Sequence, residues 1–184
     1  MNKSNNNNKR MMFNIAGIVS IIILIAFDQW TKMLAVNKLM NQEPFVIIEK
    51  VFQLRYLENR GAAFGILQGQ KGFFVITGII ILVAIAYLYN KMPSTKKYHL
   101  LRILAILMAA GAIGNMIDRV SKNYVVDFFY FELINFPIFN VADCYVTVAA
   151  ALLIISIMFI YKEEDFKFID LGSSKHAGEN DDAK

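Results

Sequence analysis

The sequence has few of the residues that build disulfides and metal centres. Its 184 residues include one cysteine, Cys144, and two histidines, His99 and His176. A single cysteine excludes an intramolecular disulfide framework and a cysteine-rich metal site, and two histidines argue against a histidine-built zinc centre. Chemistry in this chain must therefore be carried out by carboxylates, amides or backbone groups, and we expect no metal and no cofactor.

Charged residues are also scarce. They make up 18% of the chain, whereas soluble domains contain about a quarter. By contrast, 57% of the residues are apolar and the mean hydropathy is +0.44. A soluble core of this size cannot bury so much apolar surface, so the composition predicts a membrane protein. The net charge of +4 does not indicate nucleic-acid binding, because the basic residues flank apolar runs.

Four apolar segments are long enough to cross a bilayer, whose core of about 30 Å takes about 20 helical residues. These spans lie at about 11–28, 72–90, 100–118 and 143–161. Lysine and arginine collect in the N-terminal tail, the short second connection and the C-terminal flank, which predicts that both termini are cytoplasmic. We expect one α-helical four-span domain over 11–161, with largely disordered cytoplasmic tails at 1–10 and 162–184.

The connections expected outside the cytoplasm contain structure of their own. Apolar residues recur with helical spacing over 32–41, which predicts a short amphipathic helix on the membrane surface. Residues 52–56 alternate between apolar and polar, which is typical of a half-buried strand, and Asn59-Arg60-Gly61 indicates a turn. The aromatic run 128–131 suits the headgroup layer. We therefore expect a small extracytoplasmic β element.

Four aspartates collect on one membrane face in this topology: Asp28, Asp118, Asp127 and Asp143. Four further polar residues accompany them: Asn59, Asn115, Asn140 and Arg119. Carboxylates at membrane depth are costly and usually functional. Asp28 and Asp118 can also be explained as polar residues that end a span at the water boundary, but four helix ends do not require so many acids and amides on one face.

Two carboxylates held close together cannot both ionise cheaply, so one keeps its proton near neutral pH. Such a pair supplies a base that activates water and an acid that protonates a leaving amine, as in aspartic proteases. From the residues alone, Asp118 with Asp143 is as good a pair as Asp127 with Asp143.

Two other classes of protein fit part of the pattern. A small proton-coupled transporter or channel also gathers acids in a helical bundle, but it should hold them near the middle of the membrane. An assembly or scaffold protein needs no convergence of polar residues. The clustering of acids at one interface argues against a transporter, but the residues alone leave the choice between an enzyme and the other classes open.

Five segments, in order, resemble the motif set of the lipoprotein signal peptidases, the type II signal peptidases. The resemblance covers about residues 13–161, and the segments are Asp28-Gln-Trp-Thr-Lys32, Asn59-Arg-Gly-Ala-Ala-Phe-Gly65, Gly114-Asn-Met-Ile-Asp-Arg119, Val125-Val-Asp-Phe128 and Phe139-Asn-Val-Ala-Asp143. Each segment alone is common, whereas five in this order and spacing are specific.

The resemblance implies an aspartic endopeptidase of the bacterial cytoplasmic membrane, with Asp127 and Asp143 as its catalytic pair. Its substrates would be diacylglyceryl-modified prolipoproteins, cleaved just before the lipidated cysteine at the extracytoplasmic face. The remaining family positions would bind substrate or support the pair: Asp28, Asn59, Gly61, Asn115, Asp118, Arg119 and Asn140. We expect the enzyme to contact membrane lipids and to work as a monomer.

Overall fold

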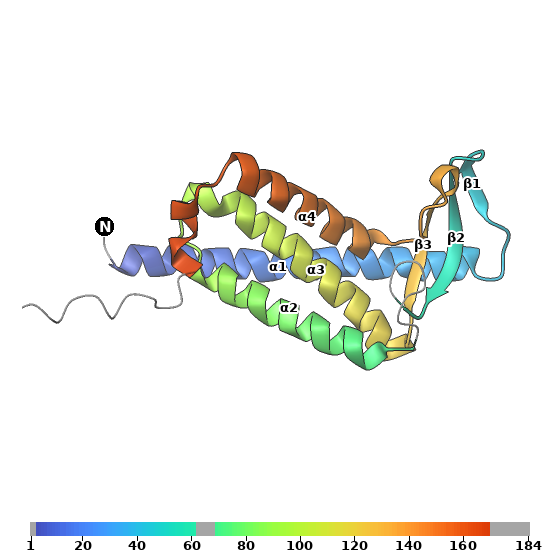
Figure 1. Ribbon diagram of the computed structural model, residues 1–184. Coiled ribbons are helices and arrows are strands. Elements are labelled where there is room, and N and C mark those ends of the chain that lie inside the picture. Colours follow the sequence, from blue (N-terminus) through green and yellow to red (C-terminus); the bar gives the residue numbers. More distant parts are fainter. Residues whose placement is uncertain (1–2, 62–68, 170–184) are drawn as a thin grey trace, which may run out of the picture.

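The computed structural model describes residues 3–61 and 69–169. Four long helices run along one another, and a small sheet lies at the end of the bundle opposite the N-terminus (Figure 1). The helices are α1 (Lys3–Leu39), α2 (Lys71–Lys91), α3 (His99–Lys122) and α4 (Val141–Phe159). The strands are β1 (Phe45–Ile48), β2 (Phe52–Asn59) and β3 (Val125–Phe131), and short 3-10 turns cover Lys96–Tyr98, Glu132–Ile134 and Glu163–Ile169.

All four helices are long and apolar enough to cross a membrane. Their outward faces carry large apolar side chains; on α2, Ile80 and Val83 are each 64% exposed, and no residue of that helix is buried. Apolar surface on this scale indicates contact with lipid, because soluble proteins rarely expose contiguous patches of it. The prediction of a four-span helical membrane protein with a small β element is confirmed.

The first helix differs from the prediction at both of its ends. Residues 3–10, expected to be disordered, form the first turns of α1, since each residue added to an existing helix gains a backbone hydrogen bond without a new nucleation step. The amphipathic segment 32–41 is not a separate surface helix, because α1 continues unbroken to Leu39. In this segment Ala35 and Leu39 pack under the sheet, while Met33 is exposed.

The chain after the last span also contains structure. Glu163–Ile169 forms a 3-10 helix, and Phe166 and Phe168 from it pack on the buried side chains of Tyr98 and Tyr161. Within the tail that was predicted to be largely disordered, 163–169 is therefore ordered, because these aromatic contacts hold the segment against the bundle. The rest of the predicted tail, 170–184, lies outside the described residues.

The sheet is antiparallel, in the order β1-β2-β3. The alternating segment at 52–56 is part of β2, as predicted. No strand was predicted at the position of β3, whose first four residues are all buried and so show no alternation. Phe128, expected in an interfacial aromatic belt, instead packs with Val126 and Val141 in the core beneath the sheet.

Candidate active site

Every predicted site residue lies where the sheet meets the bundle. They come from five separate parts of the chain: Asp28 on α1, Asn59 and Gly61 at the end of β2, Asn115, Asp118 and Arg119 on α3, Asp127 on β3, and Asn140 and Asp143 at the start of α4. The structure therefore brings together side chains that are up to 115 positions apart, from Asp28 to Asp143.

Asp127 is held by two amide side chains. The strand pairing of β3 with β2 places it opposite Leu57, two residues before Asn59. Asn140 donates to Asp127 Oδ1 over 2.6 Å and Asn59 donates to Oδ2 over 2.8 Å. Only 1% of Asp127 is exposed. Burial and the neighbouring charge of Asp143 raise its pKa to about 7, against the opposing effect of the two amide donors.

Asp143 is fixed by the first turn of α4. Asn140 is the N-cap of this helix, and its side-chain oxygen accepts from the Asp143 backbone N–H over 3.0 Å. In return, Asp143 Oδ2 accepts from the Asn140 backbone N–H over 3.1 Å, which completes a capping box. The other carboxylate oxygen accepts from Asn115 Nδ2 over 2.7 Å.

Asn140 connects the two carboxylates directly. Its side-chain amide donates to Asp127 while its backbone N–H donates to Asp143. The same amide group also donates to Asn115 Oδ1 over 3.1 Å. Two donors of one residue therefore fix the carboxylates of a strand and of a helix relative to each other.

Asp28 and Asp118 do not mark helix ends in water, because both are fully buried. Asp28 Oδ1 accepts from the Ala142 backbone N–H over 2.9 Å, at the start of α4. Asp118 Oδ2 accepts from the Val126 backbone N–H over 3.2 Å, next to Asp127. Asp28 thus connects α1 to α4, which carries Asp143, and Asp118 connects α3 to β3, which carries Asp127.

Lys32 is a buried cation at the centre of this cluster. Its ammonium lies 2.9 Å from Asp28 Oδ2, 3.2 Å from Asp118 Oδ2 and 2.8 Å from Asn115 Oδ1. The three N–H groups of a lysine are matched by three acceptors, as a buried charge requires. Asp118 is also paired with Lys122 over 3.0 Å.

Two glycines let the helices approach closely enough for these contacts. A Cβ at Gly114 would lie 2.7 Å from Asp28 Oδ2, and one at Gly111 would lie 2.5 Å from the carbonyl oxygen of Ala142. Real Cβ atoms do not approach other atoms so closely, so the packing of α1 and α4 against α3 requires glycine at both positions.

Arg119 contacts Phe74 and the Gly61 carbonyl oxygen rather than its neighbour in the sequence, Asp118. Within the described residues it forms no ion pair with Asp118, whose oxygens are already occupied by Lys32 and Lys122. Its guanidinium lies 4.6 Å from the centre of the Phe74 ring and approaches the Gly61 carbonyl oxygen at 3.5 Å. Gly61 itself donates to Asn59 Oδ1 over 3.0 Å, which forms the predicted turn. The predicted small residues Ala62 and Ala63 lie outside the described residues.

Comparison with known proteins identifies the family. The family described as signal peptidase (SPase) II, Peptidase_A8, matches residues 20–159. The chain belongs to the signal peptidase II family. It is therefore an aspartic peptidase and a multi-pass bacterial membrane enzyme, and the transporter and scaffold alternatives are not supported.

Individual members of the signal peptidase II family match over nearly their whole length. The lipoprotein signal peptidase of Streptococcus thermophilus is 45% identical over 154 residues, which cover 84% of this chain and 97% of that protein. The lipoprotein signal peptidase of Clostridioides difficile is 42% identical over 143 residues, covering 77% and 94%. A solved bacterial membrane enzyme superposes with a TM-score of 0.69 at 32% identity, covering 87% of this chain and 94% of that one.

Two lysines of the peptidase cluster, Lys32 and Lys122, were not predicted as site residues. A lysine four residues after the aspartate that ends a span resembles an ordinary surface charge. The position of Lys32 was nevertheless informative, since residues i and i+4 share one helical face, and Asp28 was expected to face the other acids. In the described part of the chain, no three or more His, Cys, Asp or Glu side chains are arranged so that they could hold a metal ion.

Proposed function

We propose that this signal peptidase II removes signal peptides from lipid-modified lipoprotein precursors, using Asp127 and Asp143 to activate water. The observation that carries this assignment is the double contact of Asn140, which donates to both carboxylates. The lipoprotein substrate is supported by the similar proteins, which are lipoprotein signal peptidases.

The two carboxyl groups take different roles in this mechanism. Asp127, whose pKa burial and the neighbouring Asp143 raise to about 7, holds the shared proton in this proposal, and Asp143 acts as the base. Asp143 accepts a proton from water as the water oxygen bonds to the carbonyl carbon that precedes the lipidated cysteine. Asp127 gives its proton to the carbonyl oxygen. As that carbonyl re-forms, its hydroxyl proton returns to Asp127, Asp143 gives its proton to the cysteine nitrogen, and the C–N bond breaks.

The surrounding polar groups hold this arrangement before the substrate binds. Asn115 and Asn59 each fix one carboxylate from outside the pair. Arg119, which lies beside Gly61 and forms no ion pair among the described residues, binds a backbone carbonyl of the precursor in this proposal. Lys32 neutralises Asp28 and Asp118 and orients Asn115, which preorganises the site for the charge that develops in the transition state.

We further propose that the enzyme acts as a monomer with both termini in the cytoplasm and the sheet outside it. All residues of the proposed site come from one chain, and the end of the bundle opposite the sheet carries basic flanks. Single cysteines at Glu49→Cys and Lys97→Cys, in a Cys144→Ser background, should report this orientation. An impermeant maleimide added to intact cells should label only the first, and labelling of Lys97→Cys alone would reverse the topology.

The peptidase mechanism is tested by processing of a lipidated precursor in liposomes. Asp127→Asn and Asp143→Asn should each abolish cleavage while the protein still inserts and unfolds cooperatively. Asp165→Asn is the matched control, because Asp165 lies at the other end of the bundle in an exposed pair with Lys97. Normal cleavage by either dyad variant would refute the assignment, and inhibition by chelators would indicate a metal.

A further inference from the structure

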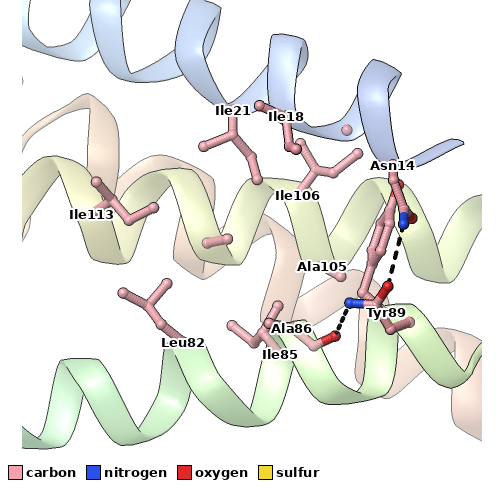
Figure 2. Close-up of a pocket in the computed structure, with 13 residues that line it drawn as sticks. Asn14, Ile18, Ile21, Leu82, Ile85, Ala86, Tyr89, Ala105, Ile106 and Ile113 are labelled. Carbon is pink, nitrogen blue, oxygen red and sulfur yellow. Dashed lines mark hydrogen bonds between the residues drawn. The ribbon is translucent and has the colours of Figure 1, made fainter. Parts of the chain in front are cut away.

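A hollow between the helices lies well away from the carboxylate cluster. It is about 390 Å³ in volume and is enclosed by α1, α2 and α3 near the N-terminal end of α1 (Figure 2). Its walls are mostly apolar, with a polar end formed by Asn14, Tyr89 and Asn90. The apolar lining residues include Ile18, Ile21, Leu82, Ile85, Ile106 and Ile113.

The hollow exists because α1 and α2 diverge above α3. Within the described residues, two hydrogen bonds join α1 to α2, and both are at the polar end: Asn14 donates to Asn90 over 3.3 Å, and the Tyr89 hydroxyl donates to the Phe13 carbonyl oxygen over 2.9 Å. The floor contains small side chains, Ala105 and Ala109 on α3. Since α2 has no buried residue, nothing in the described protein closes the space between the two helices.

One polar atom at the end of the hollow lacks a partner. Asn14 Oδ1 is buried and accepts no hydrogen bond from the described residues, whereas the Nδ2 of the same amide donates to Asn90 (Figure 2). A buried acceptor without a donor costs free energy. An occupant with a hydroxyl donor at this depth would satisfy it.

Among the described residues, the charge at this end of the bundle is predominantly positive. Arg10 lies one helical turn before Asn14, and Lys91 follows Asn90; both side chains are exposed. Other basic residues at this end are Lys9, Lys96, Lys97, Lys162 and Lys167, against the acidic residues Glu163, Glu164 and Asp165. This charge complements an anionic headgroup and opposes the positively charged end of a signal peptide.

The volume distinguishes a lipid chain from a peptide helix. A membrane-spanning helix is about 10 Å across and 30 Å long, which is roughly 2,000 Å³, several times the hollow. Pockets for small organic ligands are about 300–1,000 Å³ and mostly apolar, with a few polar groups at one end. A single acyl chain meets these conditions, and a helix does not.

We propose that this hollow is a binding site for one acyl chain of an anionic phospholipid. The chain lies between α1 and α2 on the alanines of α3. The phosphate lies against Arg10 and Lys91, and a headgroup hydroxyl donates to Asn14 Oδ1. Such a lipid fills the gap beside α2 and connects it to α1 beyond the two hydrogen bonds at the polar end.

The test compares phosphatidylglycerol with phosphatidylcholine as probes, using native mass spectrometry of the full chain in detergent. Ala86 lines the hollow and Ala84, two residues away on α2, does not. Both are exposed, so Ala86→Leu and Ala84→Leu form a matched pair. Ala86→Leu should weaken phosphatidylglycerol binding about tenfold, the loss expected when two methylene contacts are blocked, and Ala84→Leu should bind as the unaltered chain does.

Two further measurements distinguish loss of this site from misfolding of the variant and from binding of another ligand. A phosphatidylglycerol with a photoreactive acyl chain should crosslink to peptides within 14–21, 82–90 or 105–113. Arg10→Gln with Lys91→Gln should remove the preference over phosphatidylcholine, and Lys96→Gln should keep it. Equal binding by the two leucine variants, crosslinks elsewhere, or one-for-one displacement of the lipid by a synthetic signal peptide would each overturn the proposal.

Discussion

The Lys32 ammonium donates to Asn115 Oδ1 over 2.8 Å, and this contact connects a buried cation to the carboxylate pair. Asn115 has one amide, whose oxygen accepts from Lys32 and whose nitrogen donates to Asp143. With its oxygen directed to Lys32, the nitrogen must point toward Asp143. Lys32 therefore fixes the orientation of the Asn115 amide, so that its nitrogen donates to Asp143, although Lys32 itself contacts neither Asp127 nor Asp143.

Replacing Lys32 should lower both the free energy of unfolding and the rate of precursor cleavage. Lys32→Met leaves Asp28 and Asp118 buried without their shared cation, and breaking such a pair costs about 3 kcal/mol or more. Thermal unfolding in detergent should show the loss, and adding Asp118→Asn should restore part of it by removing one unpaired charge. Lys97→Met is the control, since its pair with Asp165 is exposed and should leave the melting temperature unchanged. A Lys32→Met protein as stable as the parent would contradict the role of this cation.

The raised pKa of Asp127 should make the fold less stable as pH rises. The folded state binds this proton more tightly than the unfolded chain does, so its contribution is complete below pH 3.8 and declines up to about pH 7. Asp127→Asn has no such proton. Between pH 4 and 7.5 the unfolding free energy of the unaltered chain should therefore fall, relative to that of Asp127→Asn, by a few kcal/mol at most. Parallel curves for the two proteins would show that Asp127 titrates normally.

The alkaline limb of the pH–rate profile should depend on Asn59. The proposed mechanism needs a protonated Asp127, so cleavage should decline as pH rises through about 7. The hydrogen bond from Asn59 favours the ionised form of Asp127 and lowers its pKa. Asn59→Ala should therefore move the alkaline midpoint to higher pH, whatever happens to the maximal rate. Asn37→Ala, at an exposed site on α1, should leave the midpoint in place, and a downward shift in Asn59→Ala would contradict the assignment.

Glycine-to-alanine substitutions on two helices should have opposite effects. At Gly111 a methyl group meets the Ala142 carbonyl oxygen at 2.5 Å, and such overpacking costs about 1–3 kcal/mol. At Gly78 the nearest atom, Met116 Sδ, is 3.7 Å away, so Gly78→Ala should be neutral or slightly stabilising through helix propensity. Unfolding temperatures of the two variants in one detergent provide the comparison. Equal values would show that the contact between α3 and α4 adjusts easily.

The spans and the acidic face could be predicted because lipid imposes a simple rule. A helix in a bilayer needs a long apolar run, and alternating loops then assign Asp28, Asp118 and Asp143 to one face. The alternation at 52–56 likewise identified part of β2. In each case the pattern can be recognised because neighbouring residues along the chain share the same surroundings, lipid for the spans and the two faces of the sheet for 52–56.

The features that were missed depend on contacts between distant segments. Burial of Lys32 requires Asp118 and Asn115, which are more than 80 positions away, and no local pattern encodes that. The first four residues of β3 are all buried, so this strand lacks the alternation of a surface strand. The choice of Asp127 over Asp118 as the partner of Asp143 came from the family resemblance, because only the fold shows that Asp118 is already neutralised by two lysines.

The ionic composition of the cluster has one more consequence. Four aspartates, Asp28, Asp118, Asp127 and Asp143, stand beside three cations, Lys32, Lys122 and Arg119. If Asp127 retains its proton, positive and negative charges balance, and the resting centre is electroneutral without a counter-ion from the medium. Peptide hydrolysis that starts and finishes in that state transfers no net charge into or out of the protein. Background electrolyte, which weakens attraction between exposed ions, should then leave the chemical step unaffected.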